Sequence, residues 1–168
     1  YKRQQLSRAK FEPVDIGQML EGLLRQREER GVERGVRLRF DRDEQLPMIV
    51  PGEGARLERV FENLLDNAIS FSPDGGLISV AAIRRGSMLE LRFEDEGPGV
   101  PPEAREAVFR RFHSIRPTDE RFGQHSGLGL AIARTIVEGH QGTIDVESRE
   151  DRLSGARFVV RLPLSDRG

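Results

Sequence analysis

The stretch Asn63–Phe71, NLLDNAISF, decides the fold of this chain, and it lies inside a longer run that begins at Gly54. Apolar side chains recur along this run at steps of three, one and three, which is the spacing of a helix with one buried face. The pattern predicts a core helix over residues 54–71. Its buried face would carry Leu57, Val60, Phe61, Leu64, Leu65, Ala68 and Ile69.

The same helix also carries a polar seam beside its apolar stripe. Asn63 and Asn67 are four residues apart and Ser70 follows three later, so all three project from nearly one side. A carboxamide offers an acceptor oxygen and two donors without a charge, which suits a hard cation or the phosphate and water around one. The alternative is a pair of surface asparagines, and so short a motif does not decide between the two.

Composition limits the possible functions. The chain has 168 residues, 36% hydrophobic and 33% charged, which predicts one globular domain with a substantial core. The absence of cysteine excludes disulfides, thiolate chemistry and cysteine-ligated metals. A net charge of -1 means that the chain has no excess of positive charge with which to bind nucleic acid, so we expect no such partner. The chain shows no apolar run of membrane-spanning length and no signal peptide, so we expect it to be soluble and cytoplasmic.

The elements around the central helix can be predicted in order. Residues 1–10 look like the end of a segment that continues upstream, and 11–168 like the domain proper. Asp15 is placed as an N-cap for a helix that ends near residues 31–35. We expect strands at 11–14, 36–41, 48–50, 77–84, 88–94, 143–148 and 156–162, a short helical piece at 101–107 and a helix ending near Gly139.

An acidic residue ends the strand at 88–94. Leu89, Leu91 and Phe93 share one face, and by alternation Asp95 falls on the same inward side. A buried carboxylate needs hydrogen-bond donors. Gly97 and Gly99 follow in a D-x-G-x-G pattern, and glycines let a flat ligand approach the backbone closely. The alternative is an Asx-type turn at a strand end.

A polar, basic stretch from residue 113 to 126 has no apolar period, so we expect a mobile loop there. It follows VFRRF, residues 108–112, and ends in SGLGLAIA, residues 126–133, where glycines run into an apolar helix. Free N–H groups at such a helix start, together with its dipole, form an anion site. Helices with glycine at the start are frequent, so this motif alone is not specific.

The order of these motifs resembles a known family. NLLDNAISFS is similar to the N box, DEGPGV to the first glycine box, VFRRF to the F box and HSGLGLAIA to the second glycine box. These boxes mark the ATP-binding catalytic domain of sensor histidine kinases, in the gyrase, Hsp90, histidine kinase and MutL superfamily. The resemblance covers residues 11–162. The tract FGQHSGLGLAIAR further resembles alphaproteobacterial kinases of the ChvG/ExoS type.

The resemblance implies a two-layer α/β sandwich of the Bergerat ATP-binding type: a mixed sheet with helices on one face and a mobile ATP lid. It also implies a site for Mg-ATP. Asp95 would accept from the adenine amino group, Phe71 would pack beside the base, and Asn63 and Asn67 would hold Mg²⁺ and phosphate oxygens. Gly97 and Gly99 would border the base. The residues facing the phosphates would be Ser126, Gly127, Leu128 and Gly129.

Two positions depart from the family pattern. Ser70 stands where the family often has Lys, which removes a cation expected near the phosphates, and His125 replaces the usual first glycine of the second glycine box. The loop at 113–126 would form the lid. Its residues Arg116 and Arg121 are candidates to supply the missing charge, because arginine binds phosphate bidentately. A solvated lid face is the alternative for each.

Asn63 bears on the reaction. Hydrolytic members of the superfamily, and its serine kinases, carry Glu there as a base, whereas Asn cannot take a proton. An imidazole acceptor is already a nucleophile, so Asn63 favours phosphoryl transfer to histidine over hydrolysis. Glu62 lies about 100° around the helix and is discounted as the base.

The resemblance therefore implies a protein-histidine kinase catalytic domain in two-component signalling. Its partners would be a dimerisation and phosphotransfer domain that bears the acceptor histidine, normally in cis, and a cognate response regulator. We expect a monomeric fragment of a homodimeric parent, which could be anchored in the inner membrane.

Other functions stay open. An ATP-sensing or partner-sequestering module would bind ATP without transferring phosphate, and a degenerate structural domain would not bind it. His113, His125 and His140 lie in or beside loops, outside the context of a phosphoacceptor and without metal-ligand spacing. We interpret them as ordinary polar residues and expect no autophosphorylation of the fragment.

Overall fold

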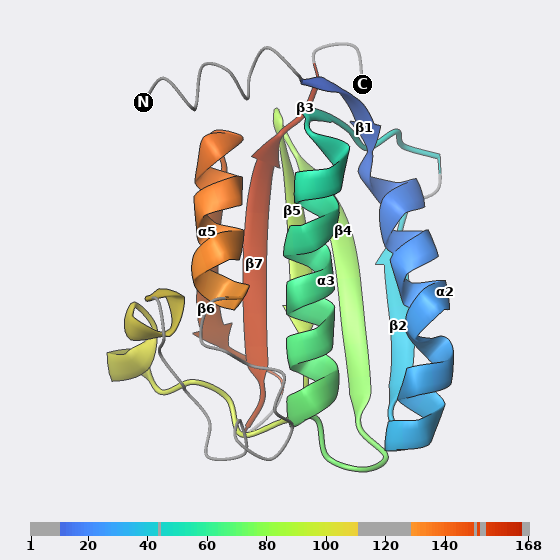
Figure 1. Ribbon diagram of the computed structural model, residues 1–168, viewed down its shortest axis with the longest axis vertical. Helices are drawn as coiled ribbons and strands as arrows, with labels where there is room; N and C mark the ends of the chain where they lie inside the picture. Colours follow the sequence, from blue (N-terminus) through green and yellow to red (C-terminus); the bar gives the residue numbers. More distant parts are fainter. Residues whose placement is uncertain (1–10, 44, 111–128, 150, 152–153, 166–168) are drawn as a thin grey trace.

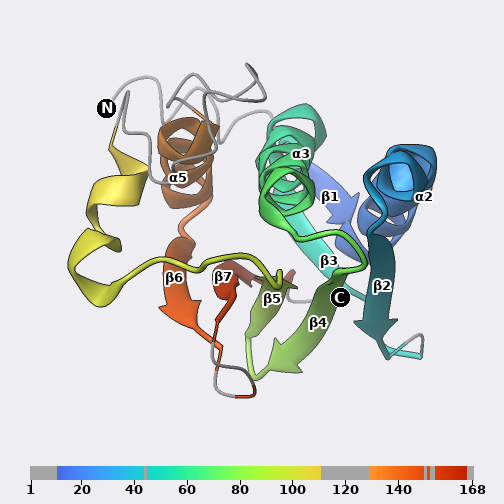
Figure 2. The ribbon, with the colours of Figure 1, turned by 90° about the horizontal axis from the view of Figure 1, so that it is seen from below.

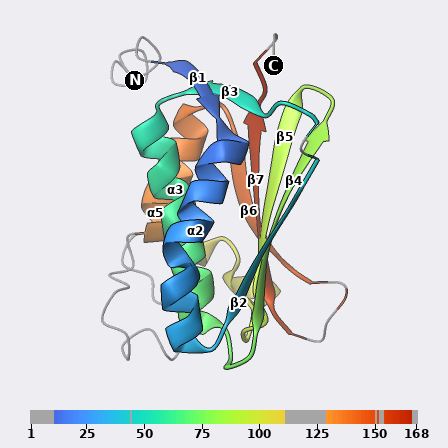
Figure 3. The ribbon, with the colours of Figure 1, turned by 90° about the vertical axis from the view of Figure 1, so that its right-hand side faces the viewer.

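The computed structural model describes residues 11–43, 45–110, 129–149, 151 and 154–165, and these form two layers. Three helices, α2, α3 and α5, lie side by side over one face of a five-stranded sheet (Figure 1). Figures 2 and 3 show the layers edge-on, with these helices on one side of the strands. The α/β sandwich with a mixed sheet and helices on one face is confirmed.

Helix α3, Gly54–Phe71, occupies the centre of the helical layer, as predicted (Figure 1). Each of the seven apolar side chains assigned to its inner face is at most 3% exposed. The apolar stripe continues without a break from Leu57 to Ile69 and packs on the sheet. The helix therefore holds its polar seam in a fixed direction.

Helix α2, Ile16–Arg34, begins and ends where the sequence predicted. The Asp15 side chain accepts from the N–H of Gln18 over 3.0 Å, which is an N-cap bond. Gly35 ends the helix in the left-handed conformation, with φ 72°. Arg27 of α2 forms ion pairs with Asp66 at 2.9 Å and Glu62 at 3.5 Å. Glu62 therefore faces α2, which agrees with discounting it as a base.

The five-stranded sheet has the order β2-β4-β5-β7-β6. β2 and β4 are parallel and the other pairs are antiparallel, so the sheet is mixed. The strand face toward the helices carries the alternating apolar residues of the core. The bounds are Arg37–Arg42 for β2, Leu77–Arg85 for β4, Met88–Glu94 for β5, Thr143–Ser148 for β6 and Ala156–Pro163 for β7.

Two short strands, β1 (Glu12–Asp15) and β3 (Ile49–Gly52), form a separate antiparallel pair. The sequence predicted a strand at 48–50, which stops before Pro51, whereas the strand in the structure includes Pro51, opposite Pro13. Each strand of a two-stranded pair has an open edge, so a proline need not remove a ladder hydrogen bond.

The predicted helical piece at 101–107 is two short 3₁₀ turns, η1 (Pro102–Ala104) and η2 (Ala107–Phe109). Phe109 is buried and its ring meets that of Phe158 edge-on, with centroids 6.2 Å apart, so this aromatic of VFRRF is a core anchor. Phe112 and the predicted mobile loop at 113–126 lie outside the described residues. None of the described helices combines the length and apolar character needed to cross a membrane.

Candidate functional site

The polar seam of α3 is present and is mostly buried. Asn67 and Ser70 are each 5% exposed, and Asn63 is half-buried. The Nδ2 atom of Asn67 has no hydrogen-bond partner among the described residues. A buried donor without a partner costs about 1–3 kcal/mol, so a ligand that satisfies this side chain would recover that cost. The surface-asparagine alternative is therefore wrong for Asn67.

Asn63 connects the seam to helix α5, Gly129–Gly139. Its Nδ2 donates a hydrogen bond to the main-chain oxygen of Gly129 over 3.1 Å. A Cβ added to Gly129 would lie 3.7 Å from the amide carbon of Asn63, so the two residues are in close contact. The structure thus brings the N-terminus of α5 beside the polar face of α3.

Asp95 follows directly after β5 and is 1% exposed, so the predicted inward direction is confirmed. Its Oδ1 atom accepts from the N–H of Gly97 over 2.9 Å and from the N–H of Ala156 over 3.2 Å. The first of these bonds is an Asx-type turn, so that interpretation also holds. The buried carboxylate receives the donors that it requires.

The glycine-containing loop lies against the end of α3. A Cβ on Gly97 would lie 2.5 Å from the main-chain oxygen of Phe71, so only glycine lets the loop approach this closely. Gly99 has φ +78°, a left-handed conformation that favours glycine. Phe71 is 6% exposed. Asp95, Gly97 and Phe71, which the sequence had assigned to one site, therefore lie together.

Two residues to which the sequence assigned no role hold this region in place: Glu96, inside the first glycine box, and Arg34, outside the motifs. The Oε1 atom of Glu96 accepts from the N–H of Leu77 over 3.1 Å and ties the loop to the start of β4. Arg34, in the last turn of α2, donates through Nη2 to three carbonyls at the end of α3, those of Ile69, Ser70 and Ser72, the last over 2.6 Å. The only sequence signal for Arg34 was a basic residue at the end of a helix.

The interpretation of His140 as an ordinary polar residue is wrong. It is 3% exposed, its Nδ1 lies 2.8 Å from the oxygen of Ile136, and its Nε2 accepts from the N–H of Glu53 over 3.1 Å. The accepting Nε2 places the proton on Nδ1, so the ring is neutral. Its ring also stacks on that of Phe11, 4.7 Å away. Burial lowers the pKa of His140.

The described residues cover only part of the predicted site. Among the described residues, no group of three or more His, Asp or Glu side chains could hold a metal ion. Of the glycine-led segment before α5, the described part begins at Gly129. The following lie outside the described residues, so their roles stay predictions: Arg116, Arg121, Ser126, Gly127 and Leu128, and with them His113 and His125.

Comparison with known proteins agrees with this arrangement. Residues 52–166 match the family described as histidine kinase-, DNA gyrase B-, and HSP90-like ATPase. The chain is 40% identical to sensor protein ChvG of Rhizobium meliloti (strain 1021), over 95% of this chain and 29% of that protein. It is 34% identical to sensor protein ChvG of Agrobacterium fabrum, over 96% of this chain and 29% of that protein. The chain thus spans under a third of these relatives.

The fold also matches solved structures. The mycobacterial sensor histidine kinase MprB superposes with a TM-score of 0.79 at 31% identity, covering 92% of this chain and 97% of that one. Full-length ShkA in complex with AMPPNP superposes with a TM-score of 0.78 at 25% identity, covering 93% of this chain and 31% of that one. The resemblance to histidine kinase catalytic domains, including those of the ChvG type, is confirmed.

Proposed function

The chain belongs to the histidine kinase-, DNA gyrase B-, and HSP90-like ATPase family, and we propose that it binds Mg-ATP and donates the γ-phosphoryl group to a histidine on another domain. The observation that carries this proposal is the buried Asp95 carboxylate beside Gly97 and the end of α3, the helix whose polar seam carries Asn63 and Asn67.

Adenine recognition is assigned to the end of β5. A carboxylate accepts from the adenine amino group, and Asp95 is buried where competing water is excluded. Gly97 and Gly99 border the base because they keep the loop free of side chains. Phe71, at the end of α3, packs beside it. In support, the relative ShkA was solved with AMPPNP, an ATP analogue.

The residues present fit a magnesium ion that accompanies the phosphates. Carboxamide oxygens are hard ligands of the kind that Mg²⁺ accepts. The amide nitrogen of Asn67, which has no partner among the described residues, is a donor and suits a phosphate oxygen or a water molecule beside the ion. Asn63 and Asn67 would hold the ion, which, when bound, neutralises charge on the phosphates. The asparagines also orient phosphate oxygens, since each offers donors as well as an acceptor.

The phosphates extend toward α5 in this proposal. Gly129 lies beside Asn63, and the free N–H groups at a helix N-terminus favour an anion. Ser126, Gly127 and Leu128 precede this point in the sequence and complete the phosphate contacts. Because Ser70 is not a cation, we assign the balancing positive charge to Arg116 and Arg121 of the lid.

The acceptor is a histidine rather than water. Asn63 cannot act as a base, and Glu62 is engaged with Arg27 on the other side of α3. The acceptor would be carried by a helical dimerisation and phosphotransfer domain. Transfer onward would be to a response regulator. We place the domain in the cytoplasm as a monomer, within a dimeric parent.

The test is a transfer assay with γ-labelled ATP. We expect no stable label on the 168-residue chain alone, and acid-labile phosphohistidine on a separately produced dimerisation domain of the parent protein. The rate should be low in trans because tethering is lost. A partner whose acceptor histidine is replaced by alanine is the control. Absence of label on the partner domain at saturating ATP would contradict the proposal. Label retained on the isolated chain would contradict it as well.

A further inference from the structure

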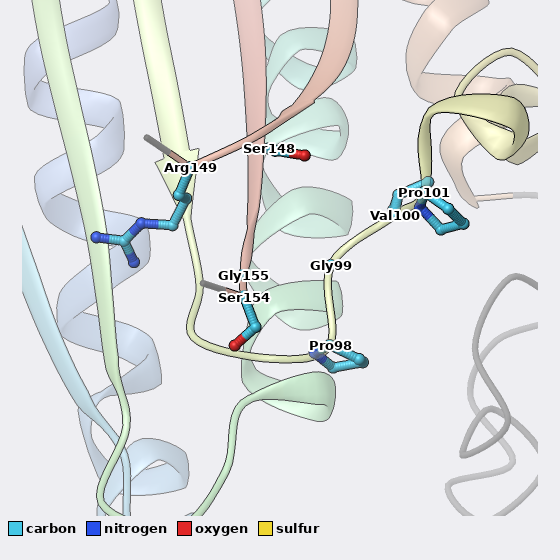
Figure 4. A pocket seen from close by; sticks show the side chains of 8 residues that line it. All are labelled: Pro98, Gly99, Val100, Pro101, Ser148, Arg149, Ser154 and Gly155. Atoms are coloured by element: carbon cyan, nitrogen blue, oxygen red, sulfur yellow. The ribbon is translucent and has the colours of Figure 1, made fainter. Parts of the chain in front are cut away.

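Arg149 belongs to none of the sequence motifs, yet it contacts the residue assigned to adenine. It lies in the turn between β6 and β7, and its side chain is 9% exposed. Its Nη1 donates a hydrogen bond over 3.0 Å to the main-chain oxygen of Asp95, 54 positions earlier. Figure 4 shows Arg149 beside the end of β5, at a pocket that Pro98 and Gly99 also line.

The bond from Arg149 restrains a carbonyl that lies beyond the paired residues of the sheet. The pairing of β5 with β7 ends at Glu94 and Arg157, one residue before Asp95. The N–H of Asp95 donates to the oxygen of Ala156 over 3.0 Å. Arg149 supplies a donor for the carbonyl on the other side of the residue. Together with the two bonds to Oδ1, these contacts fix both the backbone and the side chain of Asp95.

The carboxylate of Asp151 holds the guanidinium of Arg149 in place. Its Nε donates to Oδ1 of Asp151 over 3.1 Å and its Nη2 to Oδ2 over 2.8 Å. Such a bidentate pair restrains the plane of the guanidinium. The bond from Arg149 lowers the pKa of Asp151, so the carboxylate stays charged at neutral pH. Nη1 is thereby directed at Asp95.

Gly155 makes room for this arrangement. A Cβ at this position would lie 2.5 Å from the main-chain oxygen of Asp95 and 2.9 Å from Cδ of Arg149. Its φ of +113° also favours glycine. The β6–β7 turn therefore lacks a side chain at the point where the arginine passes over the Asp95 carbonyl.

We propose that Arg149 is a positioning residue for adenine recognition: it fixes the backbone of Asp95 and so the direction from which the carboxylate meets the base. This inference rests on the proposed function, in which Asp95 accepts from the adenine amino group. Asp151 acts through Arg149, and neither side chain needs to touch the nucleotide.

Binding of ADP and of inosine diphosphate, measured by calorimetry, tests the role. The hypoxanthine base carries an oxygen where adenine carries its amino group, so only ADP can donate to Asp95 from that position. In Arg149→Met we expect the preference for ADP over inosine diphosphate to fall by about 3- to 10-fold, because one hydrogen bond restrains the acceptor. Arg149→Lys should keep part of the preference, and Asp151→Asn should lose part of it.

Arg157→Met is the matched control. Arg157 is similarly buried, with a side chain 11% exposed, and pairs with Glu94 and Glu147. Its ADP preference should equal that of the parent chain. An unchanged preference in Arg149→Met, or an equal loss of affinity for both nucleotides, would overturn the inference and leave Arg149 a structural residue.

The proposed function fails separately. If the parent chain shows no preference for ADP, or if Asp95→Asn keeps the parent's preference, the assignment of adenine to Asp95 is wrong. A parent preference that Asp95→Asn abolishes and Arg149→Met retains would overturn the positioning role alone.

Discussion

Asn67 combines burial with an amide nitrogen that has no partner among the described residues. If its main role is to hold Mg²⁺, removing the side chain should affect ATP binding only when the ion is present. We expect Asn67→Ala to weaken ATP about tenfold or more in Mg²⁺ and about twofold or less in EDTA. Calorimetry in the two buffers measures this difference. Equal losses in both would exclude the metal role.

His140 predicts a pH dependence of stability. Burial lowers its pKa below the ordinary 6.5; the bond to Ile136 and the charge of Glu53 oppose the shift, and Arg56 adds to it. As pH falls through 6.5, the unfolded state binds a proton that the folded state does not. The stability from neutral His140 is therefore complete above that pH and is lost progressively below it.

The corresponding experiment is thermal unfolding of the parent chain and His140→Gln between about pH 7.5 and 5, where the limiting slope for one proton is about 1.4 kcal/mol per pH unit. Glutamine does not titrate, so the variant should lose less stability than the parent as the pH falls. Parallel pH profiles would show that His140 does not cause the loss.

For single residues, prediction from sequence succeeded where periodicity fixes the direction of a side chain. Helical spacing placed Asn67 on the buried seam, and strand alternation placed Asp95 inward. It failed for His140 and Arg149, because their partners Glu53 and Asp95 lie 87 and 54 positions away. No local pattern encodes such contacts.

The end of helix α3 is in close contact with the glycine-containing loop after β5. A Cβ on Gly97 would lie 2.5 Å from a main-chain oxygen, which cannot rotate away, so Gly97→Ala must move the loop or the helix. We expect a loss of about 1–3 kcal/mol in the free energy of unfolding. We also expect weaker ADP binding, because Asp95 and Phe71 separate.

Gly22→Ala in α2 is the matched control for that substitution. A Cβ at Gly22 would meet no described atom within 4 Å, so alanine should raise helix stability by up to about 1 kcal/mol. Its ADP affinity should not change. Denaturant unfolding and calorimetry on both variants provide the comparison, and full ADP affinity in Gly97→Ala would show that the close approach is not required.

Most elements could be predicted because each has its own signals: the cap at Asp15, the alternation in β5 and β7, and the stripe of α3. The pairing of β1 with β3, and the order of the strands, depend on contacts between distant segments. Neither was predicted, since periodicity gives the face of a strand but not its neighbour, and the family resemblance implied only a mixed sheet with helices on one face.

The whole molecule places the proposed site at one end of the sandwich. The loop after β5, the end of α3 and the turn between β6 and β7 lie at the lower end in Figure 1, opposite the β1–β3 pair. Asn63 connects the same region to the start of α5. The site and its supporting turn are thus formed by four segments far apart in the sequence.

Amide chemical-shift mapping of this 19.0 kDa chain with the Mg²⁺ complex of AMPPNP tests the central claim most directly. We predict saturable shifts at Asp95–Gly99, at Asn63 and Asn67 and at Gly129, with the β1–β3 pair unaffected. Absence of binding at millimolar nucleotide, or saturable shifts confined to residues away from α3 and the loop after β5, would contradict the account.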